Sequence, residues 1–322
     1  MGALAKAFKA PIGAQPKLEG LCLVSPSGRI RASVAPRDGG ALSSLCVRGC
    51  GELLYRAEEF AAPPEGAWSG RAPLLWPAVG RNYPEPGSEQ LGYSLDGRRY
   101  PMPIHGFARL VPWKVVGLRA DKQVAQAVVS LEPQPAIQRF YPWHYRLEAL
   151  HEIDDLGWSL TVTVKAPETI RFGLGNHLTL KLPAGDDFDR VVFASNASRA
   201  HVVGPDGLLT EAVRSVDLRA GVPLEQEWLL NTALGGWVAG GWAEVRYPEG
   251  PVLRITQTVN AGEGLLRPED RLFVLWGSRE QAFFCPEPWI GRPNGLQTGR
   301  GAVALPPATP FIWSMRVDID GI

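Results

Sequence analysis

The chain has 322 residues with 33 basic and 33 acidic side chains and a formal net charge of +0, so it lacks the basic surface that nucleic-acid binding requires. Its 45% hydrophobic content excludes a disordered protein. The 36 glycines, 29 prolines and 11 tryptophans indicate one large, turn-rich all-β structure.

The N-terminal stretch carries Lys6, Lys9 and Lys17, which interrupt any apolar run long enough for a secretory signal peptide. We expect residues 1–20 to form an N-terminal extension that is capable of disorder, and residues 21–322 to form a single domain. Because no targeting signal is recognised, we expect a cytoplasmic protein.

The chain has four cysteines: Cys22, Cys46, Cys50 and Cys285. No histidine or second cysteine pair lies near Cys46 and Cys50, which disfavours a zinc site. The chain is also far larger than typical disulfide scaffolds. We therefore predict free thiols.

Alternation of apolar and polar residues predicts several strands in the second half of the chain. The segments 145–153 and 158–164 both alternate, and Asp155 and Gly157 between them predict a β-hairpin. Residues 253–259 alternate with one interruption at Gln257.

Two further segments complete this pattern. Residues 228–243 contain no charged side chain, but the segment is shorter than a membrane span and rich in glycine, so it predicts buried strands and turns. Residues 311–319 form a last alternating strand. Short strands separated by turns predict antiparallel sheets packed as a β-sandwich.

Three stretches contain polar groups that a plain sandwich does not need. The first spans residues 74–109 and places Arg81, His105 and Arg109 on glycine-containing, loop-like backbone. The planar donors of arginine suit hydroxyl or carboxylate oxygens. Pairing of these arginines with surface acids, with His105 closing a turn, is an equally good interpretation of this stretch by itself.

The other two stretches contain the candidates for proton transfer. His177 follows a strand-like segment broken by two glycines, which allow a ligand to approach the backbone closely. Glu287 lies between two prolines and before Trp289, and an apolar wall of this kind raises a carboxyl pKa. Trp289 offers a flat face that could stack on a sugar ring. Structural roles for His177 and Glu287 remain the alternative.

No phosphate-binding loop, dinucleotide fingerprint, nucleophile elbow or zinc-binding helix occurs in the sequence. We therefore expect neither a cofactor nor a metal.

The three stretches, in this order, resemble the aldose 1-epimerase (galactose mutarotase-like) family. The residues that carry the resemblance are those of the segments Trp76–Asn82, His105–Arg109, Phe172–His177 and Cys285–Trp289. It extends from about Ile30 to Asp318 and is nearest to the bacterial LacX-like branch.

The resemblance implies a large antiparallel β-sandwich with a sugar-binding cleft on its concave face. It also implies that Glu287 is the base acting on the anomeric hydroxyl and His177 the acid acting on the ring oxygen. Binding of the sugar would fall to Arg81, Asn82, His105, Arg109 and Trp289. The expected reaction interconverts the α and β anomers of a hexose or related sugar.

Two departures concern specificity. Asn231 or Thr232 stands where the family often has an acid, and Asn294 replaces an Asp of the LacX-like branch. A hexose-phosphate epimerase and a non-catalytic carbohydrate-binding protein are the alternatives. The expected partner is a small sugar, without nucleic acid or membrane, and the expected state is a monomer or homodimer.

Overall fold

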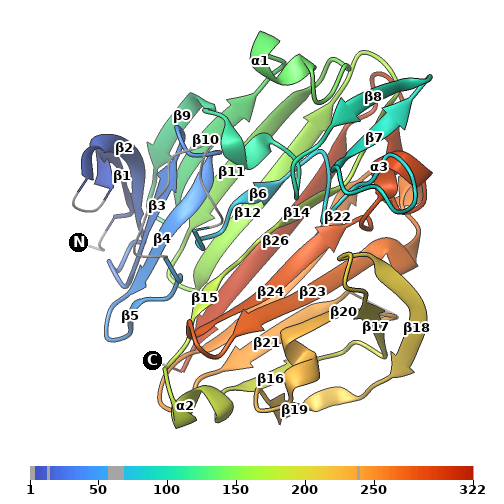
Figure 1. Cartoon of the computed structure of the whole chain (residues 1–322). Coiled ribbons are helices and arrows are strands. Elements are labelled where there is room, and N and C mark those ends of the chain that lie inside the picture. Colours follow the sequence, from blue (N-terminus) through green and yellow to red (C-terminus); the bar gives the residue numbers. More distant parts are fainter. Residues whose placement is uncertain (1–3, 13–14, 57–68, 238–239, 322) are drawn as a thin grey trace.

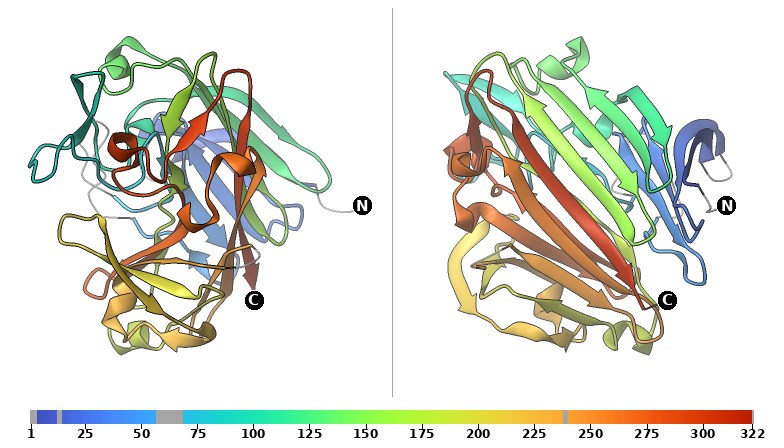
Figure 2. Two further views of the ribbon diagram at one scale, coloured as in Figure 1. Left: turned by 90° about the vertical axis from the view of Figure 1, so that its right-hand side faces the viewer. Right: turned by 180° about the vertical axis from the view of Figure 1, so that it is seen from behind.

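The computed structural model describes residues 4–12, 15–56, 69–237 and 240–321. Two large antiparallel sheets dominate this part of the chain and pack on one another, as Figures 1 and 2 show. The candidate functional residues lie on and beside the smaller of these two sheets.

Nine strands form the larger sheet within the described residues. In spatial order they are β19 (Leu218–Pro223), β16 (Val192–Ser195), β21 (Trp242–Arg246), β22 (Val252–Ala261), β26 (Phe311–Asp320), β12 (Gly157–Lys165), β11 (Arg146–Ile153), β10 (Ala125–Leu131) and β9 (Lys114–Ala120).

The second sheet has eight strands in the same described part of the chain. Its order is β18 (Leu209–Ser215), β17 (Arg199–Val203), β20 (Asn231–Gly235), β23 (Arg271–Ser278), β24 (Phe283–Ile290), β14 (Leu174–Asn176) and β6 (Leu74–Leu75), with β15 (Leu180–Lys181) also pairing with β24.

A five-stranded sheet contains the N-terminal strands. It consists of β1 (Lys6–Ile12), β2 (Gln15–Val24), β3 (Ile30–Ala35), β4 (Ala41–Val47) and β5 (Gly51–Glu52). The expected N-terminal extension, residues 1–20, therefore contributes β1 and the first part of β2, and a boundary at residue 20 would divide β2. The lysines of this stretch do not prevent backbone pairing, because Lys6 and Lys9 are exposed on β1.

Two strand pairs and several short helices connect these sheets. The pairs are β7 (Gly92–Leu95) with β8 (Arg98–Pro101), and β13 (Ile170–Phe172) with β25 (Val303–Leu305). The helices are α1 (Pro135–Gln138), α2 (Asp186–Asp189), α3 (Gly295–Thr298), η1 (Ala108–Leu110), η2 (Glu227–Leu230), η3 (Glu263–Leu265) and η4 (Pro268–Asp270). Among the described residues, no helix has the length and apolar character to span a membrane.

The strands predicted by alternation are present. β11 and β12 form the predicted hairpin, in which Ile153 pairs with Trp158. β22 and β26 cover the segments predicted around residues 253–259 and 311–319. Residues 228–243 form η2, β20 and the start of β21 within their described part. All four cysteines are free thiols, and Cys285 is buried.

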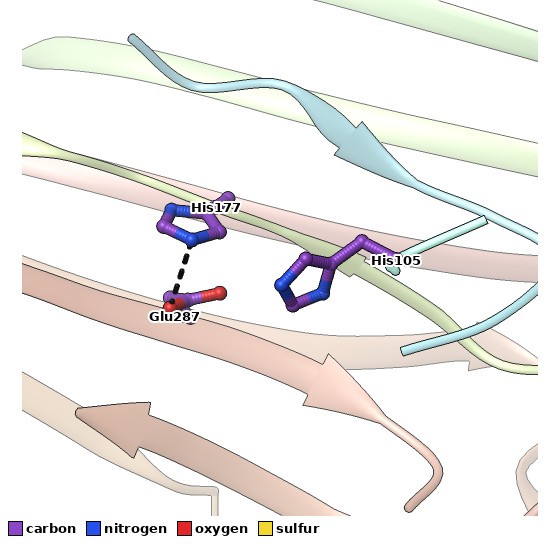
Figure 3. Close-up of side chains that lie close together, drawn as sticks. All are labelled: His105, His177 and Glu287. Carbon is purple, nitrogen blue, oxygen red and sulfur yellow. Dashed lines mark ion pairs between the residues drawn. The ribbon is translucent and has the colours of Figure 1, made fainter. Parts of the chain in front are cut away.

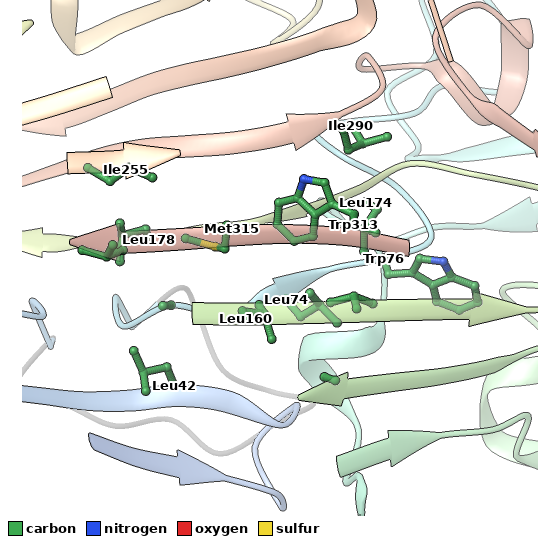
Figure 4. Packing of buried hydrophobic residues seen from close by; sticks show 14 of the residues in the cluster. Leu42, Leu74, Trp76, Leu160, Leu174, Leu178, Ile255, Ile290, Trp313 and Met315 are labelled. Carbon is green, nitrogen blue, oxygen red and sulfur yellow. The ribbon is translucent and has the colours of Figure 1, made fainter. Parts of the chain in front are cut away.

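The main core lies between the nine-stranded and eight-stranded sheets. Figure 4 shows Trp313 and Met315 of β26 and Leu160 of β12 near side chains of the opposite layer, and all belong to one buried cluster. Gln257, the interruption in the pattern of β22, joins the two layers. Its Nε2 donates to the carbonyl of Leu272 on β23 at 2.8 Å, and its Oε1 accepts from the indole of Trp313 at 3.2 Å.

Strand β24 contains two prolines although it is central in its sheet. Pro286 and Pro288 pair with β23, but on the other side β24 pairs with β14 at one end and with β15 at the other. Proline cannot donate to a ladder, so it is tolerated where the ladder is interrupted. The carbonyl of Pro288 points toward Gly175 of β14, which is on the side of β24 where the neighbouring strand is interrupted. Residues 177–179 occupy the interval between β14 and β15, opposite these prolines.

Candidate active site

A cavity of about 390 Å³ opens over β23 and β24 of the eight-stranded sheet. It brings together six of the seven residues that the sequence singled out. These are Arg81, His105, Arg109, His177, Glu287 and Trp289. Cavities of this size hold small molecules.

His177 and Glu287 face each other in this cavity (Figure 3). His177 Nε2 lies 3.4 Å from Glu287 Oε1, and the two side chains are only 5% and 2% exposed. Glu287 comes from the middle of β24, whereas His177 follows the last residue of β14. Gly175, two residues before His177, has to be a glycine because a Cβ there would lie 2.8 Å from the Pro288 carbonyl oxygen. The backbone that approaches this glycine is therefore that of the neighbouring strand β24, where the sequence had suggested a ligand.

Hydrogen bonds orient both members of this pair. The indole Nε1 of Trp289 donates to Glu287 Oε2 at 3.1 Å. The hydroxyl of Thr179 donates to the His177 carbonyl at 3.1 Å and lies 3.3 Å from His177 Nδ1. Because the single hydroxyl proton is used on the carbonyl, the Thr179 oxygen accepts from Nδ1–H. In the neutral imidazole this leaves the lone pair of Nε2 directed at Glu287.

Burial favours the neutral form of each group. It raises the pKa of the Glu287 carboxyl well above its usual range, with the Trp289 hydrogen bond acting in the opposite direction. Burial also lowers the pKa of His177 to about 3, and the positive charge of Arg109 adds to this effect. Both shifts favour a protonated Glu287 carboxyl beside a neutral His177 imidazole, an arrangement with one proton to transfer between the two groups.

His105 has the opposite tautomer. Its ring Nδ1 accepts a hydrogen bond from the Gly80 backbone N–H at 3.1 Å, and the backbone N–H of His105 donates to the Gly80 carbonyl at 2.9 Å. Burial lowers the pKa of His105 well below its usual value, and the nearby His177 adds to the shift. The neutral ring therefore carries its proton on Nε2 and is a hydrogen-bond donor.

The ligand atoms of His105, His177 and Glu287 all lie within 4.8 Å of one another, a spacing that a metal ion could bridge. A metal-bound histidine normally donates its other ring N–H to an acceptor. His105 Nδ1 instead accepts from the Gly80 backbone N–H, so the neutral ring has its proton on Nε2. Metal binding through Nε2 would have to displace this proton. The arrangement suits proton transfer better than metal binding.

The two arginines line the cavity in different ways. Arg81 Nη1 donates to the carbonyl of Asp206 at 3.1 Å, which fixes the side chain against the β17–β18 turn. Burial lowers the pKa of Arg109, on η1, and the charge of Asp38, which contacts Arg71, opposes this shift. The Nε of Arg109 is buried without a hydrogen-bond partner among the described residues. Neither arginine forms an ion pair with an acid in the described part of the chain, which was the alternative interpretation.

Asn82 is the predicted binding residue that the cavity does not include. It is 1% exposed, and its Oδ1 accepts the backbone N–H of Leu296 at 3.1 Å. This hydrogen bond joins the loop after β6 to α3. Buried side-chain amides are commonly satisfied by backbone groups in this way.

Three further residues, Trp276, Asn231 and Thr179, belong to the site. Trp276 of β23 and Asn231 of β20 pair across the sheet and line the cavity, and Trp276 lies edge-on to His177 with ring centroids 5.7 Å apart. Thr232 points away, with its hydroxyl bound to the His201 carbonyl. Of these two candidates for the position where the family often has an acid, Asn231 is the one that lines the cavity. Thr179 carries no sequence signal, because its role depends on the interruption between β14 and β15.

Comparisons with known proteins identify the family and the fold of this chain. The family model for aldose 1-epimerase matches residues 27–234. A search of curated proteins found no significant match. Among solved structures, the Slr1438 protein of Synechocystis sp. PCC 6803 superposes with a TM-score of 0.77 at 19% identity, covering 97% of this chain and 99% of that one.

Two other structures show the same fold. A galactose mutarotase-like protein from Clostridium acetobutylicum has a TM-score of 0.74 at 14% identity, with coverage of 98% of this chain and 99% of that one. Galactose 1-epimerase from Lactobacillus acidophilus NCFM has a TM-score of 0.71 at 15% identity, with 98% of each chain covered.

These structures confirm the predicted galactose mutarotase-like antiparallel β-sandwich. The assignment to a LacX-like branch stays a prediction. The family match spans well over half of the chain, and the motifs outside it, above all the strand that carries Glu287, fall within the structural match. The chain belongs to the aldose 1-epimerase family.

Proposed function

We propose that this protein interconverts the α and β anomers of a hexose or a related sugar with a free anomeric carbon. The observation that carries the proposal is the 3.4 Å approach of His177 Nε2 to Glu287 Oε1 inside the cavity. Ring opening needs one group that accepts a proton and one that donates a proton, and this pair contains one transferable proton.

The reaction begins when the proton of the pair moves from Glu287 to His177, which leaves a carboxylate and an imidazolium. Glu287 then removes the proton from O1, and the O–H electrons form the aldehyde C1=O1 bond. The C1–O5 bond breaks with its electron pair on O5, which takes the proton from His177 Nε2.

Rotation about C1–C2 then presents the other face of the aldehyde. His177 removes the O5 proton, O5 attacks C1, and Glu287 returns a proton to O1. Reclosure leaves the carboxylate and the imidazolium, and return of the proton from His177 to Glu287 restores the starting state, so that atoms and protons balance. Each of the two groups contributes roughly 10²–10⁴-fold to the rate.

The remaining cavity residues suit binding of an uncharged sugar. His105 Nε2–H and the guanidinium groups of Arg81 and Arg109 are donors for ring and hydroxyl oxygens. Trp276 and Trp289 offer apolar faces for the C–H side of the ring. These roles are supported by the shared cavity of the five side chains.

The test is anomer exchange measured by NMR for a panel of hexoses and pentoses. Glu287→Gln keeps the shape of the side chain and removes the exchangeable carboxyl proton, so we expect the exchange rate to fall by about 10²-fold or more. Glu280→Gln, which changes an exposed glutamate in the turn before the same strand, is the matched control and should match wild type.

Two results would contradict the proposal. If Glu287→Gln exchanges anomers as fast as wild type, Glu287 is not part of the proton-transfer pair. If no sugar is exchanged faster than in buffer while sugars bind saturably, the protein is a carbohydrate-binding protein instead of an epimerase.

A further inference from the structure

Asn294 is a residue that the sequence singled out and that the proposed reaction does not use. It is the N-cap residue of α3 and has a left-handed backbone with φ 62°, which asparagine tolerates better than most residues. An N-cap asparagine normally accepts a hydrogen bond from its own helix, but the Asn294 side chain makes no such bond. Its Oδ1 instead accepts the backbone N–H of Tyr83 at 2.9 Å. The side chain therefore serves a loop that is distant in the sequence.

The loop that Asn294 contacts carries Arg81. The backbone N–H of Asn294 donates to the Arg81 carbonyl at 2.7 Å. The next residue, Asn82, accepts the backbone N–H of Leu296 at 3.1 Å. Together with the bond to Tyr83, three consecutive residues of the loop are thus bonded to one short segment that begins at Asn294. These bonds fix the backbone from which the Arg81 side chain projects.

A second set of contacts holds the Arg81 side chain itself. Its Nη1 donates to the Asp206 carbonyl at 3.1 Å, and the Tyr83 hydroxyl donates to the same oxygen at 2.8 Å. A carbonyl oxygen has two lone pairs, so it can accept both bonds. A Cβ on Gly207 would lie 3.2 Å from the Arg81 Cδ, so the turn between β17 and β18 packs against the stem of the arginine.

This arrangement leaves most donors of the guanidinium group available to a ligand. Arg81 lines the sugar cavity, and the bond to Asp206 is the only hydrogen bond of its side chain within the described residues. A guanidinium group has five N–H donors. Ordering a long side chain when a ligand binds costs conformational entropy, and a side chain that is already held avoids part of this cost.

We propose that Asn294 and Tyr83 are positioning residues that fix Arg81 for sugar binding. Neither residue lines the cavity, so both act through Arg81. Neither contacts the pair of His177 and Glu287, so we expect them to affect the affinity for the sugar and not the proton transfer. The inference rests on the proposed function for its ligand.

The first test compares Asn294→Gly and Asn294→Asp with wild type. Glycine adopts the left-handed backbone but offers no acceptor to Tyr83, so we expect the KM for anomer exchange to rise about fivefold with little change in kcat. Aspartate keeps an acceptor oxygen and also tolerates this backbone, so its KM should remain near the wild-type value.

The second test removes one hydroxyl. Tyr83→Phe takes away one of the two donors to the Asp206 carbonyl, so we expect KM to rise about threefold while kcat is unchanged. Tyr100→Phe is the matched control on β8, because the hydroxyl of Tyr100 forms no hydrogen bond in the described part of the chain. This control should match wild type.

A double-mutant cycle shows whether the effect passes through Arg81. In Arg81→Gln protein the guanidinium group is already absent, so the further change Asn294→Gly should leave KM nearly unchanged. A general defect in folding would instead raise KM by the same factor in both backgrounds.

The positioning role and the epimerase proposal fail in different ways. An unchanged KM in both Asn294→Gly and Tyr83→Phe, or full additivity of Asn294→Gly with Arg81→Gln, overturns the positioning role while the epimerase proposal stands. If wild type exchanges no sugar, the proposed function is wrong. Calorimetric titration of wild type and Asn294→Gly with the same sugars then decides the positioning role, and equal affinities overturn it.

Discussion

A single hydroxyl orients the His177 ring in the proposed proton-transfer pair of His177 and Glu287. Thr179 uses its own proton on the His177 carbonyl and so must accept from Nδ1, which leaves Nε2 as the acceptor facing Glu287. Gly80 imposes the opposite tautomer on His105 through a backbone N–H. Two histidines whose rings lie 5.2 Å apart therefore present an acceptor and a donor. The tautomer of neither histidine can be assigned from the sequence alone, because it depends on these hydrogen-bond partners.

Thr179→Val tests this control of the tautomer. Valine keeps the branched shape but cannot accept from Nδ1, so Nδ1 and Nε2 compete for the proton. We expect kcat for anomer exchange to fall about tenfold with little change in KM, the equivalent of one lost hydrogen bond of about 1 kcal/mol or slightly more. The ¹⁵N shifts of His177 report the tautomer directly.

Thr179→Ser is the matched control, because it retains the hydroxyl and should restore both kcat and the tautomer. If the valine variant keeps the wild-type tautomer and rate, Thr179 has only a packing role.

At the scale of elements, the site depends on close contacts between backbones. The turn between β3 and β4 packs against η1, which carries Arg109. Gly39 in this turn has φ +67°, and a Cβ there would lie 2.5 Å from the Arg109 Cα. The five-stranded sheet thereby positions an arginine of the cavity, although none of its own strands lines it.

Gly39→Ala should displace η1 and with it Arg109. We expect a loss of unfolding free energy of about 1–3 kcal/mol from overpacking, in addition to the cost of the left-handed backbone. We also expect a higher KM for the sugar. Denaturant unfolding and NMR exchange kinetics measure the two effects.

Gly51→Ala separates these contributions. Gly51 has φ +80° but no atom within 4 Å of its added Cβ, so this variant has the backbone cost without the clash. Equal losses in the two variants, with KM unchanged in both, would show that η1 does not rest on this turn.

At the scale of the whole molecule, polar groups between the sheets link the core to pH. His151 of β11 is 2% exposed and stacks near Trp158, and its Nε2 donates to the Gly40 carbonyl at 3.0 Å. Its Nδ1 is buried with no partner among the described residues. Burial lowers the pKa of His151 to about 4, although the hydrogen bond to Gly40 opposes the shift.

This shift makes folding sensitive to acid. Between pH 6.5 and about 4 the unfolded chain binds a proton at this position and the folded protein does not, so the free energy of unfolding falls as the pH falls. We expect wild type to lose up to about 1.4 kcal/mol per pH unit more than His151→Gln across this window. Denaturant unfolding at several pH values measures the difference.

His144→Gln changes an exposed histidine that contacts Glu168 and serves as the control. A wild-type slope that persists in His151→Gln would assign the acid sensitivity to another group.

Much of the fold could be predicted from local patterns. The strands from Arg146 to Lys165 were predictable because alternation is a property of neighbouring residues on a half-buried strand. Gln257 broke that pattern because it bridges two layers, a role that its neighbours in sequence do not reveal. The prolines around Glu287 are residues that a central strand rarely contains, and here they occupy a strand whose neighbour is interrupted.

The sequence by itself determined the family, the all-β sandwich and the candidate pair of Glu287 and His177, because these are carried by ordered motifs and by alternation along the chain. The tertiary structure decided which groups meet. It excluded Asn82 from the cavity and added Trp276, Asn231 and Thr179 to the candidate site. These facts depend on strand register and on contacts between residues far apart in sequence, and that is why no local pattern contains them.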